Sequence, residues 1–242
     1  MGQPKPKDKP AESSDAAPPT SAEASAGWQP APASASRWVI GAAVLLVNLP
    51  LLHFFLLRPA PAATASLPFQ DDYSQPATVA QRYWSSGGLW RTVDGWLLSP
   101  GVKNNPLWLR ASLPQDVAVE FDVRSMSPEG DIKVEIFGDG VAHSSGYIII
   151  FGGWKNSLDV IARLDEHGQD RKEQASRGVV ANKVHRLAVE RYNGTLRFEV
   201  DGQQVMTYPD AKPLVGPGHD RFAFNDWAAP VRFDNIAIWS LE

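Results

Sequence analysis

The sequence contains no cysteine, and this absence excludes several kinds of site at once. Without a thiol the chain cannot build a cysteine zinc site, an iron–sulfur cluster, a disulfide framework or a cysteine nucleophile, nor carry the lipidated cysteine of a bacterial lipoprotein. An excess of basic residues is also missing, because 23 Lys and Arg face 27 Asp and Glu, which gives a net charge of −4. This balance argues against a nucleic acid as partner, since such proteins present a strongly basic face.

Several catalytic and cofactor motifs are missing as well. The five histidines form no H-x-H or H-x-x-x-H pair, and no serine lies in a G-x-S-x-G elbow. A phosphate-binding loop and a dinucleotide fingerprint are also not found. We therefore expect no metal and no cofactor, and the sequence assigns no catalytic residue.

The first 37 residues are rich in small residues and proline. Residues 1–36 contain nine Ala, seven Pro and six Ser, but no Leu, Ile, Val or Phe. Such a segment cannot bury enough apolar surface to offset the entropy that ordering costs. Residues 1–37 are therefore predicted to be a disordered tail.

One long apolar run follows the tail. Residues 38–57 carry no formal charge and are bracketed by Arg37 and Arg58. As a helix, 20 residues would rise about 30 Å, the thickness of the hydrocarbon core. This pattern predicts a transmembrane signal anchor in the lipid bilayer. A buried core helix is one alternative; a cleavable signal peptide is the other, because Ala63-Thr64-Ala65 matches a small-x-small cleavage site.

The positive charges around this run predict its orientation. Four Lys or Arg precede it, whereas Arg58 and Arg82 are the only two between residues 58 and 82. By the positive-inside rule the N-terminus is cytoplasmic and the C-terminal domain is extracytoplasmic, in the periplasm or at the cell surface. Residues 58–67 are predicted to be a Pro/Ala linker, and residues 68–242 a globular domain.

This domain shows the pattern of short strands separated by turns. Apolar and polar residues alternate over 117–124 and 132–136, which is typical of half-buried strands. Asn193-Gly194 lies between two such strands and predicts a tight hairpin. Helical periodicity is not sustained anywhere in the domain. The predicted fold is all-β, a two-sheet β-sandwich or jelly roll with about ten or more strands.

Four segments also carry a resemblance to known families. Residues 187–205 resemble the hairpin of laminin-G and concanavalin A-like domains, with the sequence LAVERYNGTLRFEVDGQQV. Residues 231–242 resemble the closing strand of these domains, with the sequence VRFDNIAIWSLE. Two further segments are similar to the 3-keto-disaccharide hydrolase family, also called domain of unknown function 1080. They are residues 117–125 (VAVEFDVRS) and 145–163 (SGYIIIFGGWKNSLDVIAR). The resemblance implies a two-sheet jelly roll, a fold whose concave sheet often binds glycans.

Glu120, Asp122 and Arg124 alternate along one predicted strand, so they share one face. Retaining jelly-roll glucanases use three carboxylates in a similar E-x-D-x-E strand. Here the third position is Arg124, so the acid/base of that pattern is missing, and the glucanase mechanism is disfavoured. Glu120 and Asp122 are candidate ligand contacts on the concave sheet; the alternative is a solvated face with a cross-strand ion pair.

Two tryptophans beside amide side chains form the second candidate group. Trp154 and Asn156 follow Gly152-Gly153, and Trp227 follows Asn225-Asp226. An indole can stack on a sugar ring while amides and carboxylates bond its hydroxyls, although both indoles could instead cap the core. Arg163 completes the predicted ligand-binding set, as a partner for Glu120 or Asp122 or as an ordinary outward side chain.

Two functions of different class fit these observations. The first is a non-catalytic, membrane-tethered domain that binds carbohydrate or another envelope component. The second is a glycan-processing hydrolase of the 3-keto-disaccharide hydrolase type, which the resemblance implies. The first is favoured because no complete set of acid, base and nucleophile can be assembled from the spacing.

Overall fold

The computed structural model describes residues 35–56, 61–85 and 87–242. Most of the predicted tail (1–34) and the beginning of the predicted linker (57–60) lie outside the described residues. The chain divides into two compact units, residues 1–53 and residues 54–242.

The apolar run forms a helix, α1 (Ala35–Leu56), with Pro50 inside it. The predicted membrane span over residues 38–57 is not confirmed, however. Among the described residues, no helix combines the length and the apolar character that crossing a membrane requires. Asn48 and His53 place polar side chains within the run, and the Nδ2 of Asn48 donates a hydrogen bond back to the carbonyl oxygen of Val44 (2.7 Å).

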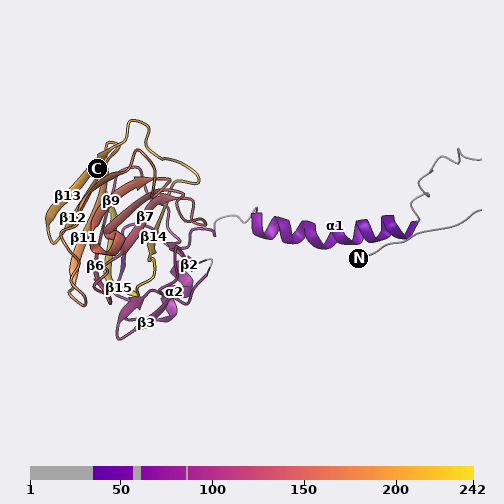
Figure 1. Ribbon diagram of the computed structural model, residues 1–242, viewed down its shortest axis with the longest axis horizontal. Helices are drawn as coiled ribbons and strands as arrows, with labels where there is room; N and C mark the ends of the chain where they lie inside the picture. The colour runs from indigo at the N-terminus through magenta and orange to yellow at the C-terminus, as the bar shows by residue number, and fades with distance from the viewer. Residues whose placement is uncertain (1–34, 57–60, 86) are drawn as a thin grey trace, which may run out of the picture. The chain divides into compact units, whose positions relative to one another are not determined.

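The larger unit is the predicted β-sandwich, and its two sheets are stacked in Figure 1. Within the described residues, eight strands form the first sheet, here called sheet A. Their spatial order is β13 (Gln203–Pro209), β12 (Thr195–Val200), β11 (His185–Tyr192), β6 (Val117–Ser125), β15 (Val231–Ser240), β4 (Trp96–Leu98) and β3 (Arg91–Val93), and β1 (Phe69–Asp71) pairs with β15.

Seven strands of the described chain form the second sheet, sheet B. Their order is β10 (Lys172–Ala175), β9 (Leu158–Arg163), β8 (Tyr147–Gly152), β7 (Ile132–Gly138), β14 (Arg221–Asn225), β5 (Leu107–Leu109) and β2 (Tyr83–Ser85). Two short helical segments accompany the sheets, α2 (Ala77–Arg82) before β2 and α3 (Gly153–Asn156) after β8. All strand pairs that carry a register are antiparallel, as expected for a sandwich.

The core lies between the two sheets, and alternation along the strands fills it. Phe121 of β6 is fully buried and contacts Phe222 and Phe224 of β14, as well as Phe233 of β15. Its neighbours along β6 point away from the core and are partly exposed. The predicted register of residues 117–124 is therefore confirmed.

The predicted hairpin is also present. Tyr192 of β11 pairs with Thr195 of β12. Asn193 and Gly194 between them both have positive φ, 47° and 75°, the turn geometry that matches the twist of paired strands.

The compact domain begins a few residues before the expected Pro68. The backbone N–H groups of Thr64 and Ala65 donate to the carbonyl oxygen of Arg110 at 2.8 and 3.0 Å. Ala65 and Leu67 pack against the core. The described part of the predicted linker is therefore attached to the sandwich.

Candidate functional site

The outer face of sheet B carries polar side chains that are buried. Lys133 and Glu135 of β7 point away from the core between Ile132, Val134 and Ile136, which point into it. Both are nevertheless almost inaccessible, at 1% and 0% exposure. Loops fold over this face and cover it. A buried charge is costly unless it is paired, so the partners of these two groups define the site.

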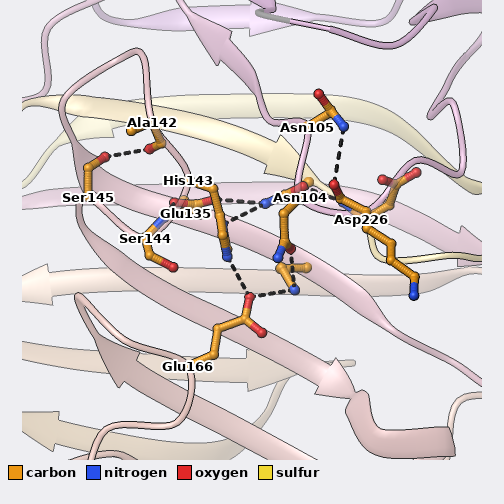
Figure 2. A network of polar contacts seen from close by, with 12 residues as sticks. Asn104, Asn105, Glu135, Ala142, His143, Ser144, Ser145, Glu166 and Asp226 are labelled. Carbon is orange, nitrogen blue, oxygen red and sulfur yellow. Dashed lines mark hydrogen bonds and ion pairs between the residues drawn. The ribbon is translucent and has the colours of Figure 1, made fainter. Parts of the chain in front are cut away.

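Glu135 is held by groups from a neighbouring strand and from the loop between β7 and β8. Its Oε1 accepts a hydrogen bond from Nδ2 of Asn225 (2.7 Å) and lies 2.7 Å from Nδ1 of His143. Its Oε2 accepts the backbone N–H of Ser144 (2.9 Å). Figure 2 shows His143 lying between Glu135 and Glu166, whose Oε1 is 2.9 Å from Nε2 of the same imidazole.

This network sets the protonation of its members. Burial lowers the pKa of His143, but the hydrogen bonds and charges of Glu135 and Glu166 outweigh it and raise the pKa to about 9. Burial acts to raise the pKa of Glu166, but His143 and Lys133 lower it to about 2. At neutral pH His143 is therefore an imidazolium that lies beside the ionised carboxylate of Glu166.

Beside this network lies a cavity of about 300 Å³ on the outer side of sheet B. Glu166 and Lys133 line it, and so do the two tryptophans predicted as ligand contacts. The indoles of Trp154 and Trp227 are 37% and 39% exposed, so neither is sealed in the core. The structure thus brings Trp154 and Trp227 together, because β7 lies between β8, which precedes Trp154, and β14, which precedes Trp227.

A left-handed turn presents Trp154. Trp154, Lys155 and Asn156 have φ values of 49°, 59° and 63°, in a region that costs L-residues free energy. The preceding Gly152 has φ 69°, and a Cβ there would lie 2.5 Å from Cγ2 of Val179, so the position requires glycine. Such strain persists only where the surroundings hold it, and it clusters at functional sites.

Asn156 holds this turn rather than facing the cavity. Its Nδ2 donates to the carbonyl oxygens of Pro128 (3.1 Å) and Val179 (2.7 Å), and its Oδ1 accepts the N–H of Val179 (2.8 Å). The predicted ligand contact is thus replaced by a positioning role, because all these bonds go to neighbouring backbone.

Cations lie against both indoles. The Nζ of Lys103 and that of Lys133 are 4.6 and 5.3 Å from the ring centroid of Trp227. The guanidinium of Arg171 is 5.0 Å from the ring of Trp154. These contacts restrict the rotation of both indoles.

Asp131 also lines the cavity, as do Glu129 and Glu166, and the sequence placed none of these three acidic residues in the ligand site. Asp131 has a positive φ, 64°, and its backbone N–H donates to the carbonyl oxygen of Gly152 (2.8 Å). Burial raises the pKa of Asp131 to about 6, against the lowering effect of Lys133. Within the described chain its carboxyl group accepts no hydrogen bond, so it is available to a ligand.

Glu120 and Asp122 lie on the other side of the sandwich. They occupy the outer face of β6 in sheet A, so the expected arrangement on one face with Trp154 and Trp227 is wrong. Arg186 of the neighbouring β11 pairs with Glu120 at 2.9 Å and with Asp122 at 3.2 Å. This is the cross-strand ion pair that the sequence analysis gave as the alternative to a ligand contact.

Arg163 pairs with neither of these carboxylates. It lies at the end of β9 in sheet B, where its Nε donates to Oδ2 of Asp210 (2.9 Å). The hydroxyl of Tyr147 donates to the same oxygen (2.6 Å). Arg163 therefore fixes the segment between β13 and β14, and the structure does not bring it to the cavity. The predicted pairing with Glu120 or Asp122 does not form because Arg163 lies in sheet B, whereas both carboxylates lie on β6 in sheet A.

Several solved structures are similar to this chain in fold. The carbohydrate-binding module CBM66 from Bacillus subtilis is similar with a TM-score of 0.54 and 18% identity, over 65% of this chain and 95% of the module. A β-glucanase from Bacillus licheniformis is similar with a TM-score of 0.51 and 13% identity, over 72% of this chain and 98% of the enzyme. A glycosidic hydrolase is similar with a TM-score of 0.53 and 11% identity, over 76% of this chain and 99% of the hydrolase.

At these identities the similarity shows the fold alone. It confirms the all-β, two-sheet sandwich, similar to a jelly roll, that the strand pattern predicted. No family model and no curated protein matches the chain, and membership of the 3-keto-disaccharide hydrolase family is not confirmed.

The alternation of residues along β7 was a sequence signal for Lys133 and Glu135, which were not predicted as site residues. Lys133 and Glu135 alternate with apolar residues, as Glu120 and Asp122 do. Both strands fit the same period of two, so the period alone could not show which polar face lies under loops.

The described residues also contain no group of three or more His, Asp or Glu side chains arranged to hold a metal ion.

Proposed function

We propose that this domain binds carbohydrate, without catalysis, in the cavity lined by Trp154 and Trp227. The observation that carries the proposal is two half-exposed indoles and the unbonded carboxyl group of Asp131 in one cavity of about 300 Å³. Indoles supply apolar area for the face of a sugar ring, and a few polar groups fix its orientation. The similar solved structures support the proposal, since they include a carbohydrate-binding module.

The size of the cavity limits the ligand. A volume of about 300 Å³ is at the lower end of the range for small-molecule sites, so it fits one or two sugar units of a chain. We expect a single sugar to bind with Kd on the order of millimolar, about −4 kcal/mol. An oligosaccharide that extends beyond the cavity should bind more tightly.

A glycan array with the full-length chain tests this proposal. The native protein should retain a small group of related oligosaccharides, and Trp227→Ala should lose them while keeping its thermal unfolding temperature. Tyr192→Ala is the matched control, because Tyr192 is an exposed aromatic residue (49%) on β11 of sheet A. Loss of binding in both variants, or in neither, would contradict the assignment of this cavity.

A hydrolase of the 3-keto-disaccharide type is the second candidate function, and one observation favours it. The pKa values of Asp131 and Glu166, about 6 and about 2, lie far apart although both carboxyl groups line one cavity. Such a difference can separate a proton donor from an ionised carboxylate. Turnover of keto-disaccharides or ordinary disaccharides that Asp131→Asn abolishes would establish the enzyme; binding without turnover would establish the binding module.

The extracytoplasmic location stays a prediction from the distribution of Lys and Arg around residues 38–57. Protease added to intact cells should degrade the sandwich domain if this location is correct. Survival of the domain under conditions that digest a known surface protein would contradict it.

A further inference from the structure

Lys133 is an unusual residue for a buried position in a strand. Its side chain is only 2% exposed, and its strand neighbours Ile132 and Val134 belong to the core. Taking an ammonium group out of water is costly, whereas a methionine of similar length would not carry that cost. The partners of this ammonium group therefore indicate what it does.

Those partners come from three separate loops. The Nζ of Lys133 donates to Oδ1 of Asn104 (2.9 Å) and to Oε1 of Glu166 (2.5 Å), and it lies 5.3 Å from the ring centroid of Trp227. Asn104 lies between β4 and β5, Glu166 between β9 and β10, and Trp227 between β14 and β15. Figure 2 shows the side chains of Asn104 and Glu166 converging on this point.

We propose that Lys133 is a positioning residue of the candidate site, whose ammonium group fixes the loops around residues 104, 166 and 227 in the arrangement that forms the cavity wall. One rigid strand thus places the indole of Trp227. The claim about ligand binding rests on the proposed function, whereas the claim about the loops does not.

Lys133 also orients the carboxylate of Glu166. Both Lys133 and His143 bind its Oε1, and among the described residues its Oε2 accepts no hydrogen bond. Because Glu166 lines the cavity, two cations on one oxygen leave the other oxygen for a ligand hydroxyl. Lys133 also connects two loops, because it binds both Asn104 and Glu166. A lysine that bound only one of these residues would leave the two loops independent of each other.

Hydrogen exchange of the full-length chain tests the loops directly. In Lys133→Met we expect amide exchange in residues 99–106, 164–171 and 226–230 to accelerate by on the order of tenfold or more, the effect of losing a hydrogen bond to a charged group. Exchange in β6 and β11 should not change. Lys172→Met is the matched control, because Lys172 is an exposed lysine of sheet B, and within the described part of the chain its Nζ donates only to the carbonyl oxygen of Thr207.

A second variant keeps the test decisive if Lys133→Met folds poorly. Lys133→Met combined with Glu166→Gln removes both the ammonium group and the carboxylate that pairs with it. The double variant therefore leaves no unpaired carboxylate at residue 166. The same three loops should exchange faster in this double variant. Unchanged loop exchange in a folded variant, or an equal increase throughout the sandwich, would overturn the proposal.

Binding measurements then separate this inference from the proposed function. With an oligosaccharide retained by the native protein on the array, Lys133→Met should weaken affinity about tenfold or more, and Lys172→Met by less than about twofold. Faster loops with unchanged affinity would overturn the positioning role. If the native chain retains no glycan, the proposed function fails, and the exchange data alone decide whether Lys133 fixes the loops.

Discussion

Replacing Asn156 by alanine perturbs the turn that carries Trp154 without touching the cavity itself. The amide makes three hydrogen bonds, at 2.7, 2.8 and 3.1 Å, to backbone groups of Pro128 and Val179. Each such bond contributes about 1 kcal/mol net, so their loss should reduce the free energy of unfolding by about 3 kcal/mol. For a domain of this size that corresponds to a decrease of roughly 6–12 °C in Tm.

The same substitution should also displace Trp154. Three consecutive residues, Trp154 to Asn156, have positive φ, and each costs roughly 1–2 kcal/mol in that conformation. Without the bonds of Asn156 the turn should relax, so glycan affinity should fall further than the fraction unfolded explains.

Thermal unfolding followed by circular dichroism measures the first effect. Lys155→Ala is the matched control, because Lys155 lies in the same turn and its side chain makes no hydrogen bond or ion pair with the described residues. We expect it to change stability by no more than about 0.5 kcal/mol. If Asn156→Ala costs less than about 1 kcal/mol, the turn does not depend on these bonds and the reasoning is refuted.

Two further predictions concern the core and the cavity. Phe121→Ala should cost about 3–5 kcal/mol, measured by urea unfolding, because the ring is fully buried among three phenylalanines; a cost under about 1 kcal/mol would contradict the register of β6. The pKa of Asp131 is about 6 in the folded chain against an ordinary value of 3.8. Between these values only the unfolded chain loses this proton, so this residue's contribution makes stability fall as pH rises from about 4 to 6. Asp131→Asn should therefore stabilise the protein by about 2–3 kcal/mol at pH 8 and by little at pH 4; equal effects at both pH values would contradict the burial of this carboxyl group.

Much of the sandwich could be predicted from local patterns. Three of the longer strands, β6, β7 and β11, alternate apolar and polar residues with a period of two, and the hairpin between β11 and β12 follows from Asn193-Gly194. The three-residue strands β2 to β5 were not predicted, because a segment so short shows no period and owes its conformation to its partners.

The site was predicted only in part, for a reason of topology. Trp154 and Trp227 are far apart in the sequence and meet because β8 and β14 both pair with β7. Asp122 and Lys133 have similar local patterns, yet they lie in different sheets. Sheet order depends on contacts between distant segments, which the alternation of residues along one strand does not encode.

The most direct test of the account is an NMR titration that follows the indole N–H signals of the full-length chain. Signals of Trp154 and Trp227 are assigned with Trp154→Phe and Trp227→Phe, and the buried Trp108 (1% exposed) serves as internal reference. On addition of an oligosaccharide retained on the array, the signals of Trp154 and Trp227 should shift together, with one Kd, while that of Trp108 stays in place. Binding that leaves both of these signals unmoved, or that shifts Trp108 to the same extent, would contradict a carbohydrate site in this cavity.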